Sequence, residues 1–354
     1  METKNTHGGD ILTAQSEYGG GILDFSVNIN PFGIPDSVRA AAAAADYTRY
    51  PDPLCRELVA GIAERDGVQP EQVLCGNGAA DIIYRLAFAS KPKAALLTAP
   101  TFSDYEEALR AVDCGIQYHL LEESENFDLT DSFLQKLDQD LDIVFLCNPN
   151  NPTGRLIDSG LMPKIIGKCG EFGIRLVVDE CFMALTDAWE SGVLPRHLSQ
   201  NPHLFLLRAF TKSMAMPGLR LGYCLSSDME LLGTLTRCGQ AWAVSEPAQA
   251  AGIAALREGG HVARARELLA IERPRLVEEL CGLGLKVYEP AANYILFRAE
   301  KIDDLKERML GQGILIRSCS NYVNLGNDYY RVAVKLREDN ERLIAALRKA
   351  LAKS

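Results

Sequence analysis

Short, mainly apolar segments alternate with helix-like segments through most of the first 226 residues of this chain. The apolar segments are "QVLC", "AALLTA", "IQYHLL", "DIVFLCN", "RLVVDE", "LFLLRAF" and "LGYCLS". Helical periodicity fills most of the gaps, for example from Ala80 to Ala89 and from Leu161 to Gly170. Strands that are apolar throughout are buried on both faces, and a helix between two of them makes the crossover that parallel strands need. The sequence therefore predicts an α/β fold whose seven-stranded, mostly parallel sheet is covered by helices.

Different patterns flank this predicted sheet. Residues 1–46 begin with a Gly-rich, irregular arm, and Pro35-Asp36 then starts a helix that runs through the alanines Ala40 to Ala45. Long helical segments extend from about Met229 to Leu283, where Pro274 is expected to kink or break a helix. Strands follow at "KVYE", "YILFRA", "GILIRS" and "YYRVAVK", and a helix from Asp339 closes the chain. We expect an arm that contributes to the small domain (1–46), a large domain (47–228) and a small α+β domain (229–354).

Composition excludes several classes of partner. The net charge is −10 and no Lys/Arg-rich run occurs, which argues against nucleic acid or an anionic membrane as partner. No apolar run reaches the length of a bilayer span, and the start "METKNTHGGD" lacks the apolar core of a signal peptide. The ten cysteines form no CxxC pair, which indicates reduced thiols in a cytoplasmic protein rather than disulfides or a zinc site.

Candidate ligand-binding residues follow the first strands. Ligands of an open parallel sheet bind beyond the carboxyl ends of its strands. After "QVLC" comes "GNGAAD", where small residues before a helix either present backbone N–H groups to an anion or make a tight turn. After "AALLTA" comes Phe102, which is either a stacking surface for a flat ring or a core residue.

The next three strand ends carry more unusual residues. "NPNNPTG" makes a rigid turn in which Asn151 can donate a hydrogen bond to a ligand oxygen. Asp179 ends an apolar strand and needs a partner, either a cationic ring nitrogen or a group of the protein itself. Thr211 and Lys212 follow "LFLLRAF", where a desolvated lysine can act as a nucleophile, and Arg220 can grip a phosphate. Together these groups match what pyridoxal phosphate requires.

The motifs "NPNNPTG", "VVDE" and "TK" followed eight residues later by an arginine resemble those of fold-type-I pyridoxal-phosphate enzymes, in the class-II aminotransferase group. The resemblance covers nearly the whole chain. It implies that Lys212 and Asp179 are catalytic, with Lys212 bonded to the cofactor and Asp179 paired with its ring nitrogen. The implied cofactor contacts are Gly78, Ala79, Phe102, Asn151, Asp179, Thr211, Lys212, Arg220 and, from the partner chain of a homodimer with shared active sites, Tyr50.

Two families of this group share these motifs: histidinol-phosphate aminotransferases and the threonine-phosphate decarboxylases of cobalamin biosynthesis. "HGGD", "DFSVNINPFG", "GNGAADIIY", "PTFSDY" and "RSCSNY" are similar to the decarboxylase versions. Phe182 stands where many aminotransferases have a tyrosine that bonds the ring hydroxyl. The resemblance implies decarboxylation of L-threonine O-3-phosphate to aminopropanol phosphate, or of L-serine phosphate to ethanolamine phosphate. The alternative is a histidinol-phosphate or related aminotransferase, since substrate placement decides which α-bond breaks.

The substrate side of the site rests on fewer clues. Its candidates, drawn from the resemblance, are His7, Asn30, Arg317, Arg331 and Lys335, with Arg331 binding the α-carboxylate. A histidine in an arm is otherwise solvated, and Arg317 can equally pair with an internal acid. The chain departs from its relatives at Ala209, where a hydroxyl is usual, and at Lys335, where the decarboxylases suggest arginine. A cofactor-sensing regulator is disfavoured, because the chain is acidic and we expect no DNA-binding domain before "HGGD".

Overall fold

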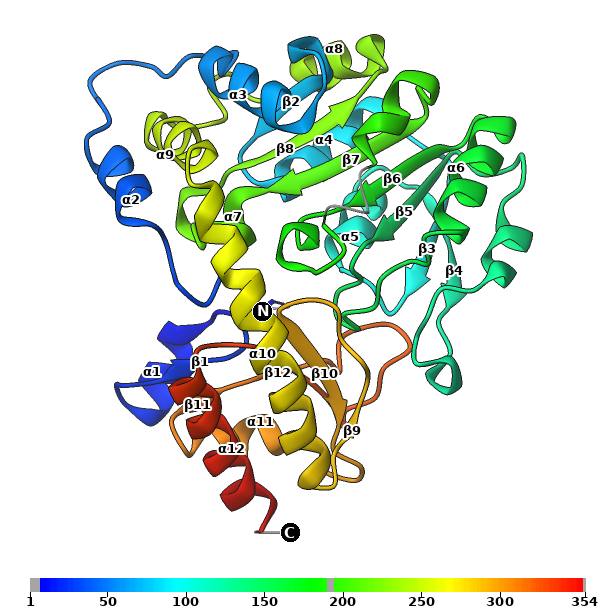
Figure 1. The fold of residues 1–354 in the computed structure, drawn as a ribbon. Helices are drawn as coiled ribbons and strands as arrows, with labels where there is room; N and C mark the ends of the chain where they lie inside the picture. The colour runs from blue at the N-terminus through cyan, green and yellow to red at the C-terminus, as the bar shows by residue number, and fades with distance from the viewer. Residues whose placement is uncertain (1–6, 190–193, 353–354) are drawn as a thin grey trace.

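A seven-stranded sheet forms the centre of the computed structural model, which describes residues 7–189 and 194–352 (Figure 1). The strand order is β2-β8-β7-β6-β5-β3-β4. β8 runs antiparallel to β2 and β7, and the other neighbours are parallel, so the predicted sheet is confirmed. The strands are β2 (Val73–Gly76), β3 (Ala94–Ala99), β4 (Gly115–Leu120), β5 (Ile143–Cys147), β6 (Arg175–Asp179), β7 (Leu204–Ala209) and β8 (Gly222–Ser226).

Helices cover both faces of this sheet. Alternate residues of a strand point to opposite faces, and β5 shows the result: Val144 and Leu146 join one apolar core, while Ile143 and Phe145 join the other. The first core includes side chains from α3 (Arg56–Asp66), α6 (Leu161–Phe172) and α9 (Glu246–Leu256). The second includes side chains from α4 (Ala79–Ser90), α5 (Asp104–Arg110) and α8 (Met229–Cys238).

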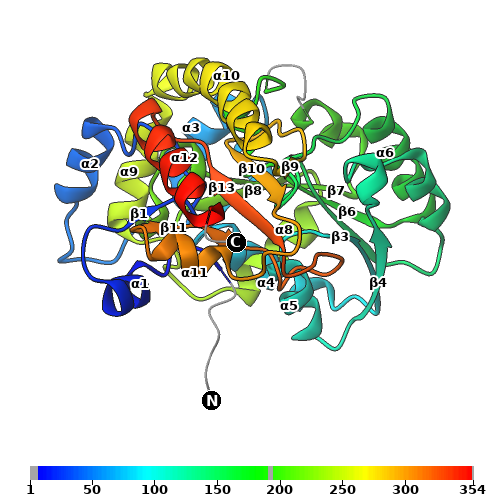
Figure 2. The same ribbon diagram turned by 90° about the horizontal axis from the view of Figure 1, so that it is seen from below.

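The small domain is built from both ends of the chain. Its main sheet is antiparallel, in the order β12-β13-β10-β9, and β1 pairs in parallel with β11. Figures 1 and 2 show α1 and β1, in blue, beside the orange and red segments near the C-terminus. The strands are β1 (Leu23–Asp24), β9 (Lys286–Val287), β10 (Tyr294–Arg298), β11 (Ile314–Leu315), β12 (Arg317–Ser318) and β13 (Tyr329–Ala333); the helices are α10 (Gly259–Gly282), α11 (Leu305–Leu310) and α12 (Arg337–Leu351).

Three details differ from the expectation. The arm is not irregular throughout, because Ile11–Tyr18 form helix α1, whose first turn is capped by the Asp10 carboxylate. Pro274 lies inside α10, which continues to Gly282, so of the expected kink or break the break does not occur. The alanine-rich helix α2 (Asp36–Ala43) ends two residues early.

The boundary between the domains stays a prediction. α8 packs on α4, and α9 packs on α2 and α3, so both belong to the layers that cover the large sheet. This packing favours a boundary close to the start of α10 rather than at residue 228. All ten cysteines are free thiols. Within the described ranges, every helix is too short or too polar to cross a bilayer.

Candidate active site

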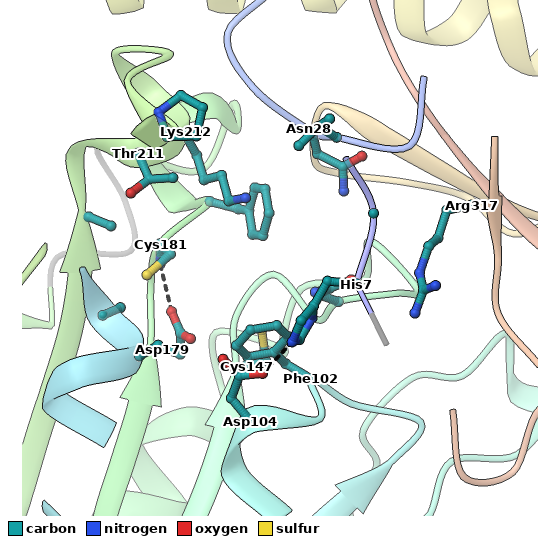
Figure 3. Close-up of a pocket in the computed structure, with 18 of the residues that line it drawn as sticks. His7, Asn28, Phe102, Asp104, Cys147, Asp179, Cys181, Thr211, Lys212 and Arg317 are labelled. Atoms are coloured by element: carbon teal, nitrogen blue, oxygen red, sulfur yellow. Dashed lines mark hydrogen bonds and ion pairs between the residues drawn. The ribbon is translucent and has the colours of Figure 1, made fainter. Parts of the chain in front are cut away.

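A cavity of about 340 Å³ lies beyond the carboxyl ends of β5, β6 and β7, where the arm and the small domain face the large sheet (Figure 3). Ten of the predicted site residues line it. They come from the arm, the strand ends and the small domain: His7, Ala79, Phe102, Asn151, Asp179, Thr211, Lys212, Arg220, Arg317 and Arg331.

Lys212 enters the cavity from α7 (Phe210–Ser213), the short helix that follows β7. Part of its surface is accessible from the cavity, but the side chain lies deep inside the protein. This burial lowers the pKa of Lys212 to about 8, and the guanidinium groups of Arg331 and Arg220 act in the same direction. Its ammonium nitrogen lies 5.3 Å from the ring centroid of Phe182. Lys212 is therefore a desolvated amine that is easily deprotonated near neutral pH.

Asp179 ends β6 and is buried. The Tyr105 hydroxyl donates to its Oδ2 at 2.7 Å, and the Cys181 backbone N–H donates to its Oδ1 at 2.9 Å. Both donors fix the orientation of the carboxylate at the floor of the cavity. The arrangement can balance a positive charge placed above it.

Asn151 is the amide of "NPNNPTG" that faces the cavity. The other two hold the loop together: Asn148 Oδ1 accepts from the Ile157 N–H, and Asn150 Nδ2 donates to Pro100 O. Asn151 Oδ1 accepts a hydrogen bond from the guanidinium of Arg331. The loop therefore leaves Asn151 to interact across the cavity with a residue of the small domain.

The start of α4 and Arg220 form a cradle for an anion. Gly78 caps α4 with φ +84°, a backbone conformation that favours glycine. A Cβ on Gly78 would lie 2.7 Å from Nη2 of Arg220. Ala79, Thr211 and Arg220 line the cavity beside this helix start, where backbone N–H groups and the helix dipole favour negative charge.

The arm and small domain supply further groups that can bind an anion. Nε2 of His7 lies 3.2 Å from Oδ1 of Asp104. Arg331 Nη2 donates to Ser26 O at 3.1 Å, while its buried Nε has no hydrogen-bond partner among the described residues. Arg317, the first residue of β12, also lines the cavity. Buried polar atoms normally have a hydrogen-bond partner. The Nε of Arg331 is therefore available to donate to a bound ligand.

Four predicted site residues do not line the cavity. Gly78 lies at its edge, behind Arg220. Tyr50 is 75% exposed and stacks on Trp242, with ring centroids 4.3 Å apart. Asn30 is buried, but its Nδ2 donates to Ser213 O. It therefore stabilises the turn formed by Thr211, Lys212 and Ser213 (the lysine turn). The Lys335 ammonium lies over the ring of Phe25, 5.6 Å from its centroid. The structure therefore does not bring Asn30 or Lys335 to the substrate side.

Sequence reasoning missed several residues of the cavity wall. Asn28 is buried there, and its Oδ1 has no partner within the described part of the chain. It stands two residues before Asn30, but no local sequence pattern marks it as a residue of the cavity. Asp104, Cys147, Cys181 and Tyr322 also line the cavity, and no local sequence pattern marks them as ligand-binding residues.

The residues present fit pyridoxal phosphate. The donor set pairs an amine of low pKa with a carboxylate held by two donors, and a helix start with an arginine lies beside them. Arg220 packs so closely against Gly78 that an added Cβ would lie 2.7 Å from its Nη2. Two buried polar atoms of the cavity wall, Nε of Arg331 and Oδ1 of Asn28, have no hydrogen-bond partner among residues 7–189 and 194–352, so each can bind a polar ligand. Over the described ranges, no three His, Cys, Asp or Glu side chains gather as metal ligands would.

Comparisons with known proteins show the family of this chain. The family model "Aminotransferase class I and II" matches residues 21–347. A threonine-phosphate decarboxylase from Salmonella typhimurium is 41% identical over 98% of this chain and 97% of its own. A histidinol-phosphate aminotransferase from Desulfitobacterium hafniense is 32% identical over 90% and 89%. The solved histidinol-phosphate aminotransferase from Clostridium acetobutylicum is 28% identical and superposes with a TM-score of 0.87, covering 94% of this chain and 100% of that one. The chain belongs to the class I and II aminotransferase family, in its fold-type-I form.

Proposed function

We propose that this enzyme decarboxylates an O-phospho amino acid for cobamide biosynthesis. The substrate is L-threonine O-3-phosphate, which gives aminopropanol phosphate, or L-serine phosphate, which gives ethanolamine phosphate. One observation carries the proposal: Arg331, Arg317 and His7 line the cavity around the space that Lys212 enters, with Arg317 and Arg331 directly opposite each other on β12 and β13. A substrate with a carboxylate and a phosphate needs two such cationic points. The Salmonella relative, named a threonine-phosphate decarboxylase, supports the same choice.

Pyridoxal phosphate is the cofactor, as predicted, since the chain belongs to a family that depends on it. The residues that would hold it are Asp179 at the ring nitrogen, Asn151 at the ring hydroxyl and Phe102 at the ring face. Ala79, Thr211 and Arg220 would hold its phosphate at the start of α4. When bound, pyridoxal phosphate supplies an electron sink for the bond that breaks at the substrate α-carbon.

The protein decides the reaction by orienting the substrate. The bond that breaks is the one held perpendicular to the cofactor ring, so two anchors fix the outcome better than one. Arg331 and the Arg317–His7 side would anchor the carboxylate and the phosphate, and that binding energy aligns the carboxylate for loss. Lys212, with its pKa of about 8, can accept or return a proton at this centre near neutral pH.

A product assay tests the proposal. The purified protein, supplied with pyridoxal phosphate, is incubated with each phospho amino acid, and carbon dioxide and phospho amino alcohol are measured. Both products should appear in equal amounts, and Lys212→Ala should form neither. Keto acid formed in the presence of 2-oxoglutarate, with no amine, would contradict decarboxylation.

The second candidate is a histidinol-phosphate or related aminotransferase. It is favoured by the Desulfitobacterium relative and by the structural similarity to the Clostridium enzyme. Histidinol phosphate lacks a carboxylate, so it would use the phosphate anchor alone. Consumption of histidinol phosphate that depends on 2-oxoglutarate would establish this reaction.

We also propose a homodimer with shared active sites. Tyr50 lies outside the cavity of its own chain and projects from the surface together with Trp242. An aromatic pair exposed in this way suits burial against a second copy. In that dimer, Tyr50 would reach the active site of the partner.

A further inference from the structure

Asp104 is an acidic residue of the cavity wall that the proposed function does not use. It is the first residue of α5, its exposed fraction is only 8%, and it lines the cavity. Figure 3 shows it beside His7, with Phe102 close by. An acid is unexpected in a cavity built for anions, since it repels a phosphate unless a positive group neutralises it.

His7 is the side chain that contacts Asp104 inside the cavity. Its Nε2 lies 3.2 Å from Oδ1 of Asp104, and its ring lies 5.9 Å from the ring of Phe102, centroid to centroid. The chain is anchored immediately after the histidine. Gly9 N donates to Ser26 Oγ at 2.8 Å, and a Cβ on Gly8 would lie 2.4 Å from Ser26 O. The backbone and the ring of His7 are therefore fixed by separate contacts.

Because Asp104 contacts Nε2 of His7, the other ring nitrogen, Nδ1, is the atom that can bind a ligand. When Nε2–H donates to a carboxylate, a neutral ring has a lone pair on Nδ1, whereas a protonated ring has a second N–H there. A neighbouring carboxylate favours the protonated ring. We propose that Asp104 is a positioning residue for His7: it holds the ring oriented and protonated, so that the Nδ1–H is a donor to the substrate phosphate. This inference rests on the proposed function, which places a phosphate on this side of the cavity.

The charges around the pair define the relevant pH range. Burial raises the pKa of Asp104 to about 6, His7 opposes this shift, and Glu107 and Asp179 add to it. Asp104 is therefore ionised above about pH 6 and loses its charge below. The other ionisable groups that face the pair are Tyr84 on α4, Arg220 after β7, and, near His7, Asp10 and Glu17 of the arm, Lys306 of α11 and Arg317 of β12.

Asp104→Asn tests the proposal, because it removes the charge and keeps the size. In the holoenzyme at pH 7.5, the KM for O-phospho-L-threonine should rise about tenfold, the usual scale for a charge-assisted hydrogen bond, while kcat changes less than twofold. The ratio of the two KM values should fall towards one below pH 6, where wild-type Asp104 is itself protonated. Asp104→Glu should keep most of the affinity. Glu106→Gln is the matched control, since its carboxylate pairs with Arg110 outside the cavity on the same helix.

A second measurement does not depend on the reaction. Inorganic phosphate is titrated into the holoenzyme, and binding is followed by the Hε1–Cε1 NMR resonance of His7, assigned by its loss in His7→Gln. Asp104→Asn should weaken phosphate binding about tenfold. Unchanged phosphate binding, or a KM ratio that does not vary with pH, would overturn the proposal. If the wild type forms no carbon dioxide from any phospho amino acid, the proposed function fails, and the phosphate titration still decides the role of Asp104.

Discussion

The guanidinium of Arg220 lies where a side chain on Gly78 would begin: a Cβ on residue 78 would be 2.7 Å from Nη2 of Arg220. The two residues are far apart in sequence and reach the same point from the start of α4 and the turn after β7. The absence of a side chain at Gly78 is therefore part of the anion cradle.

Gly78→Ala should weaken pyridoxal phosphate binding by at least about tenfold. The Cβ displaces Arg220, and the φ of +84° adds backbone strain of roughly 1–2 kcal/mol for a residue with a side chain. Cofactor titration followed by absorbance measures the dissociation constant. Gly218→Ala is the control, because nothing lies within 4 Å of its added Cβ. Equal affinities of the two variants would argue against the cradle.

Replacing Lys212 should stabilise the protein in the absence of cofactor. The pKa of Lys212 is about 8 in the fold instead of the usual 10.5, so folding at lower pH forces a charged amine into a site that disfavours it. The unfolded chain binds more protons between pH 8 and 10.5, so this penalty is complete below pH 8 and is relieved as the pH rises. Lys212→Met should gain about 3 kcal/mol of unfolding free energy at pH 7, from 1.36 kcal/mol per pKa unit.

Urea denaturation of cofactor-free wild type and Lys212→Met, at several pH values, measures this effect. The stability difference should shrink between pH 8 and 10.5. A difference that is constant with pH would instead indicate a packing effect of the methionine.

A buried ion pair beneath the site should be important for stability. Arg208 donates through Nε and Nη2 to Oε2 of Glu180, at 2.8 and 2.7 Å, and both residues are buried. Arg208→Met leaves Glu180 buried without its partner, which should cost about 3–5 kcal/mol of unfolding free energy. Arg257→Met is the control, because the Arg257–Glu57 pair is exposed and 3.9 Å apart, and should cost less than about 1 kcal/mol. Urea denaturation compares the two, and similar losses would refute the distinction.

Mixed dimers should test whether Tyr50 acts in the partner's site. Tyr50→Ala and Lys212→Ala should each be strongly impaired. If the sites are shared, a dimer containing one chain of each kind has one intact site and one doubly defective site. Refolding equal amounts together should restore about a quarter of wild-type activity, because about half of the dimers are mixed. Activity equal to the average of the separate variants would place Tyr50 outside the partner's site.

The large sheet and the strand-end residues were predictable because their signals are local. An apolar strand identifies its own burial, and parallel strands bring their carboxyl ends to one edge, so Asn151, Asp179 and Lys212 had to lie close together. The continuity of α10 through Pro274 was not predictable, because tertiary packing on both sides of a proline can keep a helix intact.

The substrate side was less predictable, because it depends on which way side chains of irregular segments turn. Asn28 and Asn30 have the same chemistry and lie two residues apart in the arm. A hydrogen bond to Ser213 O turns Asn30 towards the lysine turn, while Asn28 faces the cavity. Lys335 likewise lies over Phe25. Such choices are made by contacts between segments far apart in the chain, which no local pattern records.

The pairing of β1 with β11 sets the order in which the protein can be completed during synthesis. Leu23 lies opposite Ile314, so β1 cannot pair with β11 until nearly the whole chain has been synthesised. The seven strands of the large sheet are all complete by Ser226. Because domains generally fold as units as they emerge, we expect the lysine turn and the anion cradle to form on the nascent chain before Arg317 and Arg331 exist. The nascent chain would then have its cofactor-binding residues in place before its substrate-binding residues.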